Sequence, residues 1–428
     1  MSFKELLITP VLLTLICLVL QDDGDIPSDR IWFYKQGIKL LLSKWNYEKN
    51  IISWELGTKI YRNLDLELKE SLLMKIAAYK FDNPKNNNYV LFDEEELVNI
   101  IKYFLKISSA EALSVLKAIE TQHGLLIQRA DDLWSFSHLT FQEYFTVQWL
   151  IGLSSEQIIN KIDDANWKNV INQLVRSQQP ANQLLKSIKY AVDKFLEDEP
   201  ELQIYLKWLQ NKSESIQSHY KPITNRCFYY SISFAFEMNQ AFDYVLSLSY
   251  NPLLESIYIV DLLFMRIFDR AVDRPRNFDK VIPLDLKFAK STDPSFERAF
   301  ESSLDFDSAF DRNRSIQKSL NRILEFENIL NPILVSELSN IQVNLCLQKN
   351  ETNNDKWVGN LRELVIEHQN ICHHWNFSRE QQEKLLFYLQ ANKFIYELIC
   401  IKGAVNDELY NDLENSLLLP WDELQSRY

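Results

Sequence analysis

The stretch GLLIQRADDLWSFSHLTFQEYF, residues 124–145, decides the fold of the region around it. Residues 125–129 and 133–136 are two short, mainly apolar runs on either side of Ala130-Asp131-Asp132, a pattern that predicts a β-hairpin. Thr140 and Glu143 have the spacing of a helix start, so we predict a helix from Thr140 through Leu153. The hairpin is therefore expected to lead into a helix.

Two further helices are predicted before the hairpin. Asp93 with Glu96 and Ser108 with Glu111 have capping-box spacing, which predicts one helix to about residue 106 and a second that ends near Gly124. Two helices, a hairpin and a closing helix are the parts of a winged-helix domain, which we place at residues 83–153 after a polar break at 82–88.

The rest of the chain is predicted to be helical. Residues 1–82 form one helical region, and residues 154–428 form a C-terminal helical domain that can be divided again near residue 211. Glycine is absent from 153 to 358, which favours antiparallel helices stacked as a superhelical array. The expected fold class is therefore mainly α, with one small β-hairpin.

The N-terminal apolar run, residues 6–20 (LLITPVLLTLICLVL), has two interpretations. It could be a signal peptide or anchor, but Lys4 and Glu5 before it cancel in charge and the run is shorter than the roughly 20 residues that span a bilayer. We therefore predict a buried helix and no membrane partner. Five scattered cysteines fit a reducing compartment, so we expect a cytoplasmic protein.

Glycine content excludes several function classes. The 428 residues include only seven glycines, of which the closest two, Gly24 and Gly37, are thirteen apart. A phosphate-binding GxxxxGK[ST] or GxGxxG loop needs glycines within a few residues of each other, and neither pattern occurs. We therefore expect that this chain is not an enzyme by itself.

His138 is the candidate binding residue. It lies between the predicted hairpin and the start of the next helix, where an imidazole can donate to an anion such as a phosphate from a neighbouring domain. The alternative is a histidine that only packs. A second cluster, His368, Cys372–His374 and Cys400, lacks a second compact ligand pair, so we predict no metal site.

DNA binding by the winged helix is disfavoured by charge. The helix before the hairpin offers only Lys117 as a base, and the wing tip carries Asp131 and Asp132 beside Arg129. These carboxylates would be repelled by DNA phosphates, and the net charge of the whole chain is −13. We expect no nucleic-acid partner and predict that the module contacts protein.

The motif FSHLTFQEYF, residues 136–145, resembles the winged-helix motif of NACHT-domain NTPases of the STAND class, which include many bacterial defence proteins. Residues 9–20 resemble the helix that follows their ATPase core, and residues 34–45 the next helix. Three further segments resemble the C-terminal helical domain of cyanobacterial-type NACHT proteins: residues 205–208, residues 220–229, and residues 368–420.

The resemblance implies a nucleotide-linked regulatory role. Pro10 matches the proline that packs against adenine, and His138 matches the histidine that contacts the β-phosphate of ADP in the resting state. Because no Walker A lysine loop is present, ADP or ATP would be bound only together with an upstream NACHT core. The implied partners are that core, an effector domain or protein, and further copies on activation; the implied process is signal transduction in defence.

Two other functions stay open from the sequence. The chain could be a free-standing helical scaffold for protein interactions that binds no nucleotide. It could also be a DNA-binding winged-helix regulator, against the charge argument above.

Overall fold

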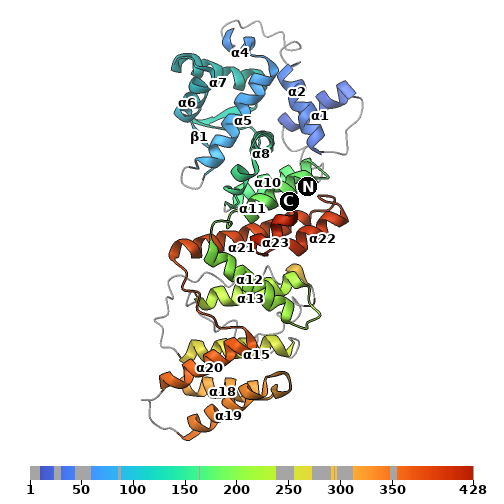
Figure 1. Cartoon of the computed structure of the whole chain (residues 1–428). Coiled ribbons are helices and arrows are strands. Elements are labelled where there is room, and N and C mark those ends of the chain that lie inside the picture. The colour runs from blue at the N-terminus through green and yellow to red at the C-terminus, as the bar shows by residue number, and fades with distance from the viewer. Residues whose placement is uncertain are drawn as a thin grey trace. The chain divides into compact units, whose positions relative to one another are not determined.

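The computed structural model describes residues 10–23, 30–43, 59–84, 88–162, 164–237, 255–271, 291–293, 295, 312–347 and 354–427. The chain divides into two compact units: unit 1 comprises Met1–Ile188 with Cys400–Val405, and unit 2 comprises Lys189–Ile399 with Asn406–Tyr428. Figure 1 labels the elements of both units. The domain limits 1–82, 83–153 and 154–428 stay a prediction.

Unit 1 contains the helices of the N-terminal region and the winged helix. Its elements are α1 (Pro10–Asp23), α2 (Arg30–Ser43), α4 (Lys59–Asn63), α5 (Leu66–Asp82), β1 (Phe92–Asp93), α6 (Glu94–Leu105), α7 (Ser109–His123), β2 (Leu126–Ala130), β3 (Leu133–Phe136), α8 (Leu139–Ile151), α9 (Ser155–Ile159), α10 (Ala165–Ser177) and the first half of α11 (Asn182–Lys194).

The capping residues predicted for the helices of the winged helix are confirmed. Asp93 and Ser108 are the N-caps of α6 and α7, and each forms a capping box with the glutamate three positions on. Gly124 ends α7 with φ +61°, a left-handed angle that glycine adopts without steric cost. The three residue patterns read from the sequence therefore begin and end these helices as predicted.

The predicted hairpin is confirmed and belongs to a three-stranded antiparallel sheet of order β1-β3-β2. Phe92 of β1 lies opposite Trp134, and Leu126 of β2 lies opposite Phe136. Asp132 at the wing tip has φ +60°, an angle that Asp tolerates better than most residues. A register shift between Gln128 and Ala130 makes Arg129 the extra residue of a β-bulge.

The core of unit 1 joins elements from both sides of the polar break at 82–88. α5 packs along α8 (Figure 1). The fully buried residues include Leu72 and Ile76 from α5 with Phe141 and Phe145 from α8. The Lys80 ammonium is buried and lies 2.9 Å from the Glu96 carboxylate of α6. This ion pair holds α5 against the start of the winged helix.

The N-terminal apolar run forms α1 from Pro10 onward; residues 6–9 lie outside the described part. Leu15 and Val19 are fully buried against α2, where Gly37 lets the two helices approach closely. The prediction of a fully buried helix is only half right, because the opposite face of α1 is exposed. No helix in the described part of the chain has the length and hydrophobicity needed to cross a membrane.

The described residues of unit 2 form helices and connecting loops, with no strand among them, which confirms the mainly α fold class. Its elements are the second half of α11, then α12 (Pro200–Ser215), α13 (Pro222–Glu237), α15 (Ser256–Ala271), α18 (Arg312–Leu324), η4 (Glu327–Ile329), α19 (Pro332–Leu347), α20 (Asn354–Gln369), α21 (Arg379–Ile399), α22 (Asp407–Ser416), α23 (Trp421–Leu424) and η5 (Gln425–Arg427).

Aromatic packing holds distant segments of unit 2 together. The Tyr205 ring of α12 lies 5.1 Å from Trp375 and 5.5 Å from Phe377, both edge-on, in the connection between α20 and α21. In the same connection Asn370, Cys372 and Asn376 have positive φ angles, and Trp208 donates its indole N–H to the Asn370 carbonyl at 2.9 Å. Contacts from α12 thus stabilise an unusual backbone path.

Candidate functional site

His138 caps the N-terminus of α8. Its backbone is extended (φ −143°, ψ 141°), and its ring Nδ1 accepts the backbone N–H of Thr140 at 3.2 Å, as an N-cap side chain does. The predicted start at Thr140 is wrong by one residue, and α8 ends at Ile151 rather than Leu153. The physical reason is that an imidazole nitrogen can replace the hydroxyl oxygen as the capping acceptor.

The cap determines which ring nitrogen of a neutral His138 carries the proton. Nδ1 also contacts the Thr140 hydroxyl, which can donate to it as well. A nitrogen that accepts hydrogen bonds has no hydrogen of its own, so the proton of the neutral ring is on Nε2. Nε2–H is then a donor beside the positive end of a helix, an arrangement suited to an anion.

The other residues of the FSHLTFQEYF motif build the scaffold of this site. Phe136, Phe141 and Phe145 are buried in the core of unit 1. Gln142 is fully buried, and its side-chain amide donates to the Tyr89 carbonyl at 2.6 Å. The motif therefore combines one candidate ligand-binding residue with residues that fix α8 in place.

Arg129 also contributes to this site, which was not predicted from the sequence. Its guanidinium donates to the Ser135 hydroxyl at 2.9 Å and to the Ser137 carbonyl at 3.2 Å, directly before His138. The sequence carried no signal of this, since the bulge that redirects Arg129 depends on the register of β2 against β3.

Pro10, the second predicted site residue, is the first residue of α1. Its side chain lies outside the described part of the structure, so its role against adenine stays a prediction. The outward face of α1 carries Leu13, Cys17 and Leu20, at helical spacings of four and three residues. Leu13 and Leu20 are 45% and 39% exposed, which makes this face an apolar stripe.

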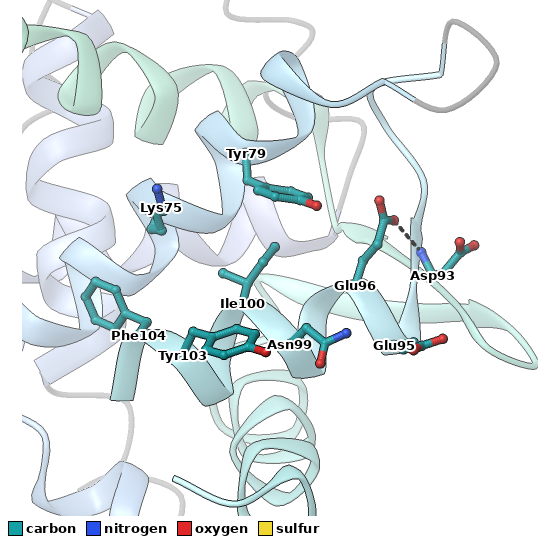
Figure 2. Close-up of a pocket in the computed structure, with 9 residues that line it drawn as sticks. All are labelled: Lys75, Tyr79, Asp93, Glu95, Glu96, Asn99, Ile100, Tyr103 and Phe104. Atoms are coloured by element: carbon teal, nitrogen blue, oxygen red, sulfur yellow. Dashed lines mark hydrogen bonds between the residues drawn. The ribbon is translucent and has the colours of Figure 1, made fainter. Parts of the chain in front are cut away.

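A cleft of about 720 Å³ lies between α5 and α6 (Figure 2). Lys75 and Tyr79 project from α5, while Asn99, Tyr103 and other residues line it from α6. Three carboxylates, of Asp93, Glu95 and Glu96, lie at one end; Glu96 accepts the Asp93 backbone N–H at 2.9 Å and is ion-paired with Lys80. The Glu96 carboxylate is thus fully engaged in structural contacts.

A second cleft of about 810 Å³ lies at the wing. Five carboxylates and no basic residue are among the residues that line it: Asp93, Glu94, Glu95, Asp131 and Asp132. In a winged helix the recognition helix and the wing meet DNA, so this charge opposes binding to phosphates. The wing is therefore acidic in the folded structure, and the absence of a nucleic-acid partner stays a prediction.

The His/Cys cluster is engaged in protein contacts. His373 bonds Asn370 at 2.9 Å, and His374 bonds Arg362, whose guanidinium also donates to the Cys372 carbonyl at 2.8 Å. Burial raises the pKa of the Cys372 thiol, which disfavours the thiolate that a metal requires. Across the described residues, no group of three or more His, Cys, Asp or Glu side chains is placed to hold a metal ion.

Unit 2 also contains a buried polar centre. The Lys212 ammonium lies 2.8 Å from the Asp261 carboxylate and donates to the Gln369 carbonyl at 2.7 Å, and the Tyr229 hydroxyl donates to Asp261 at 2.6 Å. Lys212 and Asp261 are almost completely buried. These bonds join α12, α13, α15 and the end of α20, so the centre serves packing.

The segments that carry the resemblance in unit 2 meet in space. Arg226 of α13 donates to the Asn415 and Leu417 carbonyls at 2.7 and 2.9 Å, and Lys221 pairs with Glu414 at 2.9 Å. These contacts join the 220–229 segment to the 414–420 segment, across about two hundred residues of sequence. The aromatic residues of α12 join the same group, as described above.

Among the described residues, a small winged helix precedes a region built of helices and their connecting loops. Residues 30–150 match the family model described as winged helix-turn-helix domain C-terminal to NACHT, and residues 333–420 match NACHT C-terminal Helical domain 2. In these two stretches the chain therefore matches models of domains that lie C-terminal to NACHT, in agreement with the predicted resemblance to the C-terminal part of a NACHT-domain NTPase.

No curated protein and no solved structure is significantly similar to this chain. The two family matches are therefore the comparisons that bear on its function. They identify a NACHT-associated portion and include no NTPase core.

Proposed function

We propose that this chain is the regulatory portion of a NACHT-type signal-transduction NTPase, and that His138 contributes a contact to ADP bound by the NACHT core. The observation that carries the proposal is the capped His138 ring, whose Nε2–H is a donor at the N-terminus of α8. The family matches support the presence of a NACHT region as the partner that would present the nucleotide.

In the proposed resting state, Nε2–H of His138 donates to a phosphate oxygen of ADP, and the dipole of α8 adds to the attraction. Exchange of ADP for ATP removes this contact and shifts the protein toward an open form. The chain itself supplies binding and restraint, and hydrolysis belongs to the NACHT core.

The apolar stripe of α1 supports a NACHT core as the neighbour of unit 1. A helix that is apolar on all sides is usually buried on all sides, and Leu13 and Leu20 are exposed in the described structure. We propose that the core covers this face. A role in bacterial defence and self-assembly on activation belong to the same proposal and rest on the resemblance of the motif.

The acidic wing supports protein contact over DNA contact within this proposal. Asp131 and Asp132 are exposed at the wing tip, and the cleft beside them is lined by carboxylates. The alternative function, a protein-interaction scaffold, uses the same surface but needs no nucleotide. The two functions therefore differ in whether His138 is needed to retain ADP.

The test is ADP retention by the protein that contains both its NACHT region and this chain. His138→Ala removes the ring and the cap, whereas His138→Asn removes the ring but keeps a good N-cap, because the Asn side-chain oxygen accepts the same backbone N–H. We expect both variants to release ADP about tenfold faster or more, as for the loss of a bond to a charged group. Bound nucleotide is measured after denaturing the purified protein.

His138→Asn separates the two roles of the residue. It should keep the thermal stability of the parent, while His138→Ala should lose about 1 kcal/mol with the cap. If His138→Asn retains ADP as the parent does, the proposed contact is wrong and the scaffold function is favoured.

A further inference from the structure

A β-bulge at Arg129 changes the direction of its side chain relative to a regular strand. Gln128 pairs with Trp134 and Ala130 pairs with Leu133, so Arg129 between them is the extra residue on β2. A bulge bends its strand and re-aims a side chain. Here the redirected guanidinium extends to the junction where β3 ends and α8 begins.

The guanidinium bonds three acceptors in this junction. Its Nε donates to the Ser135 hydroxyl at 2.9 Å, and one terminal nitrogen donates to the Ser137 carbonyl at 3.2 Å and, at the longer distance of 3.5 Å, to the Phe136 carbonyl. The Ser137 carbonyl belongs to the peptide group that joins Ser137 to His138. Because a peptide group is planar, holding its oxygen also restrains the orientation of the His138 backbone N–H and Cα.

Two further bonds restrain His138. The Ser137 backbone N–H donates to the Leu125 carbonyl at 2.8 Å, before the restrained peptide group, and the Thr140 N–H donates to the ring after it. The backbone on the N-terminal side of His138 is thus fixed by Leu125 and Arg129, and the ring is fixed by α8. Removing Arg129 would leave the Ser137 carbonyl without the bond that comes from the wing.

We propose that Arg129 is a positioning residue for His138: it fixes the Ser137–His138 peptide group and thereby the direction in which Nε2–H points. This inference rests on the proposed function, because it concerns how His138 is presented to a phosphate. The fork of a guanidinium is needed to bond Ser135 and Ser137 together, and a lysine ammonium on its flexible stem does not reproduce it.

The first experiment observes the His138 ring in this chain without nucleotide. Ring nitrogens are detected in long-range ¹H–¹⁵N spectra of protein labelled at histidine, and His138→Asn assigns the signals. We expect the parent to show a bare Nδ1 and a protonated Nε2. Arg129→Ala should give averaged shifts of mixed tautomers, Arg129→Lys should resemble Arg129→Ala, and Lys117→Ala on the exposed face of α7 is the matched control.

A purely structural role for Arg129 gives a different result. In that case Arg129→Ala lowers the melting temperature but leaves the His138 ring shifts unchanged, and the proposal is overturned. The Lys117→Ala control excludes a general effect of losing a positive charge from unit 1.

The second experiment separates this inference from the function on which it rests. In the protein with its NACHT region, Arg129→Ala should speed ADP release in the same direction as His138→Asn, by about tenfold at most. If neither variant changes ADP release, the proposed function fails and the ring shifts still decide the positioning role. If only His138→Asn does, and the ring shifts of Arg129→Ala are unchanged, the positioning role fails alone.

Discussion

At the scale of single residues, His138 shows why a correct motif gave a helix start one residue too late. The spacing of Thr140 and Glu143 matches a capping box, and nothing local in the sequence distinguishes it from the cap two residues earlier. The structure selects His138 because its extended backbone brings Nδ1 to the Thr140 N–H. The candidate residue itself was predictable, but its capping role was not.

His123 is a residue whose environment was not predictable from the sequence. It lies in the last turn of α7, 4% exposed, with Nδ1 3.2 Å from the Leu41 carbonyl and its ring edge-on to Tyr61. Burial, reinforced by the nearby Lys69 charge, lowers the pKa of His123 to about 4, against the partial compensation from Leu41. The ring is therefore neutral in the folded protein at pH 7.

We predict that unit 1 loses stability on acidification because of His123. The unfolded ring binds a proton near pH 6.5 and the folded ring only near pH 4, so the unfolded state gains protons first as the pH falls. The loss is on the order of 3 kcal/mol between these values. His123→Gln, which keeps a donor for the Leu41 carbonyl but does not titrate, should flatten this part of the curve in urea unfolding. Equal slopes in both proteins would contradict the assignment.

At the scale of elements, the sequence predicted the helices that begin with a four-residue capping pattern. It also predicted the strands whose pairing partners are adjacent in the chain. The capping boxes of α6 and α7 and the β2–β3 hairpin are local features, and all were predicted. β1 is two residues long and pairs with β3 about forty residues later. Such non-local geometry leaves no periodic signal in the sequence.

Two helical glycines lead to opposite predictions. A Cβ on Gly37 of α2 would lie 2.4 Å from Cγ of Leu15, whereas a Cβ on Gly359 of α20 meets nothing within 4 Å. We expect Gly37→Ala to destabilise unit 1 by about 1–3 kcal/mol through overpacking against α1. Gly359→Ala should stabilise unit 2 by about 0.5–1 kcal/mol through helix propensity. Thermal unfolding of the two variants in parallel checks the signs; a stabilising Gly37→Ala would show that α1 can move away.

At the scale of the whole molecule, both units combine apolar packing with buried ion pairs. Unit 1 has a mainly apolar core and buries the Lys80–Glu96 pair between α5 and α6. Unit 2 buries ion pairs completely, as with Lys189 and Asp193 on α11 and Lys212 and Asp261 between α12 and α15. The helical class of unit 2 could be predicted from its lack of glycine, but the burial of these pairs could not, because it depends on which helix faces pack together in the folded unit.

We predict that Lys212→Met lowers the unfolding free energy of unit 2 by about 3–5 kcal/mol, because the Asp261 carboxylate remains buried without its cation. Lys207→Met on the same helix removes an exposed pair with Glu423, 2.6 Å apart, and should cost under about 1 kcal/mol. Calorimetry of both variants, compared with the parent, tests this difference. Similar losses in the two variants would mean that the buried pair contributes no more than a surface one.

The use of one imidazole nitrogen as the cap of α8 has a consequence for how the state of His138 can be observed. The Thr140 amide hydrogen is held by Nδ1, so its exchange with solvent reports whether the ring is in place. Any event that withdraws the ring, whether protonation, alkylation or a change of rotamer, frees that hydrogen and frays the first turn of α8. Hydrogen exchange at the Thr140 amide thus reports whether the His138 ring is bound at the start of α8.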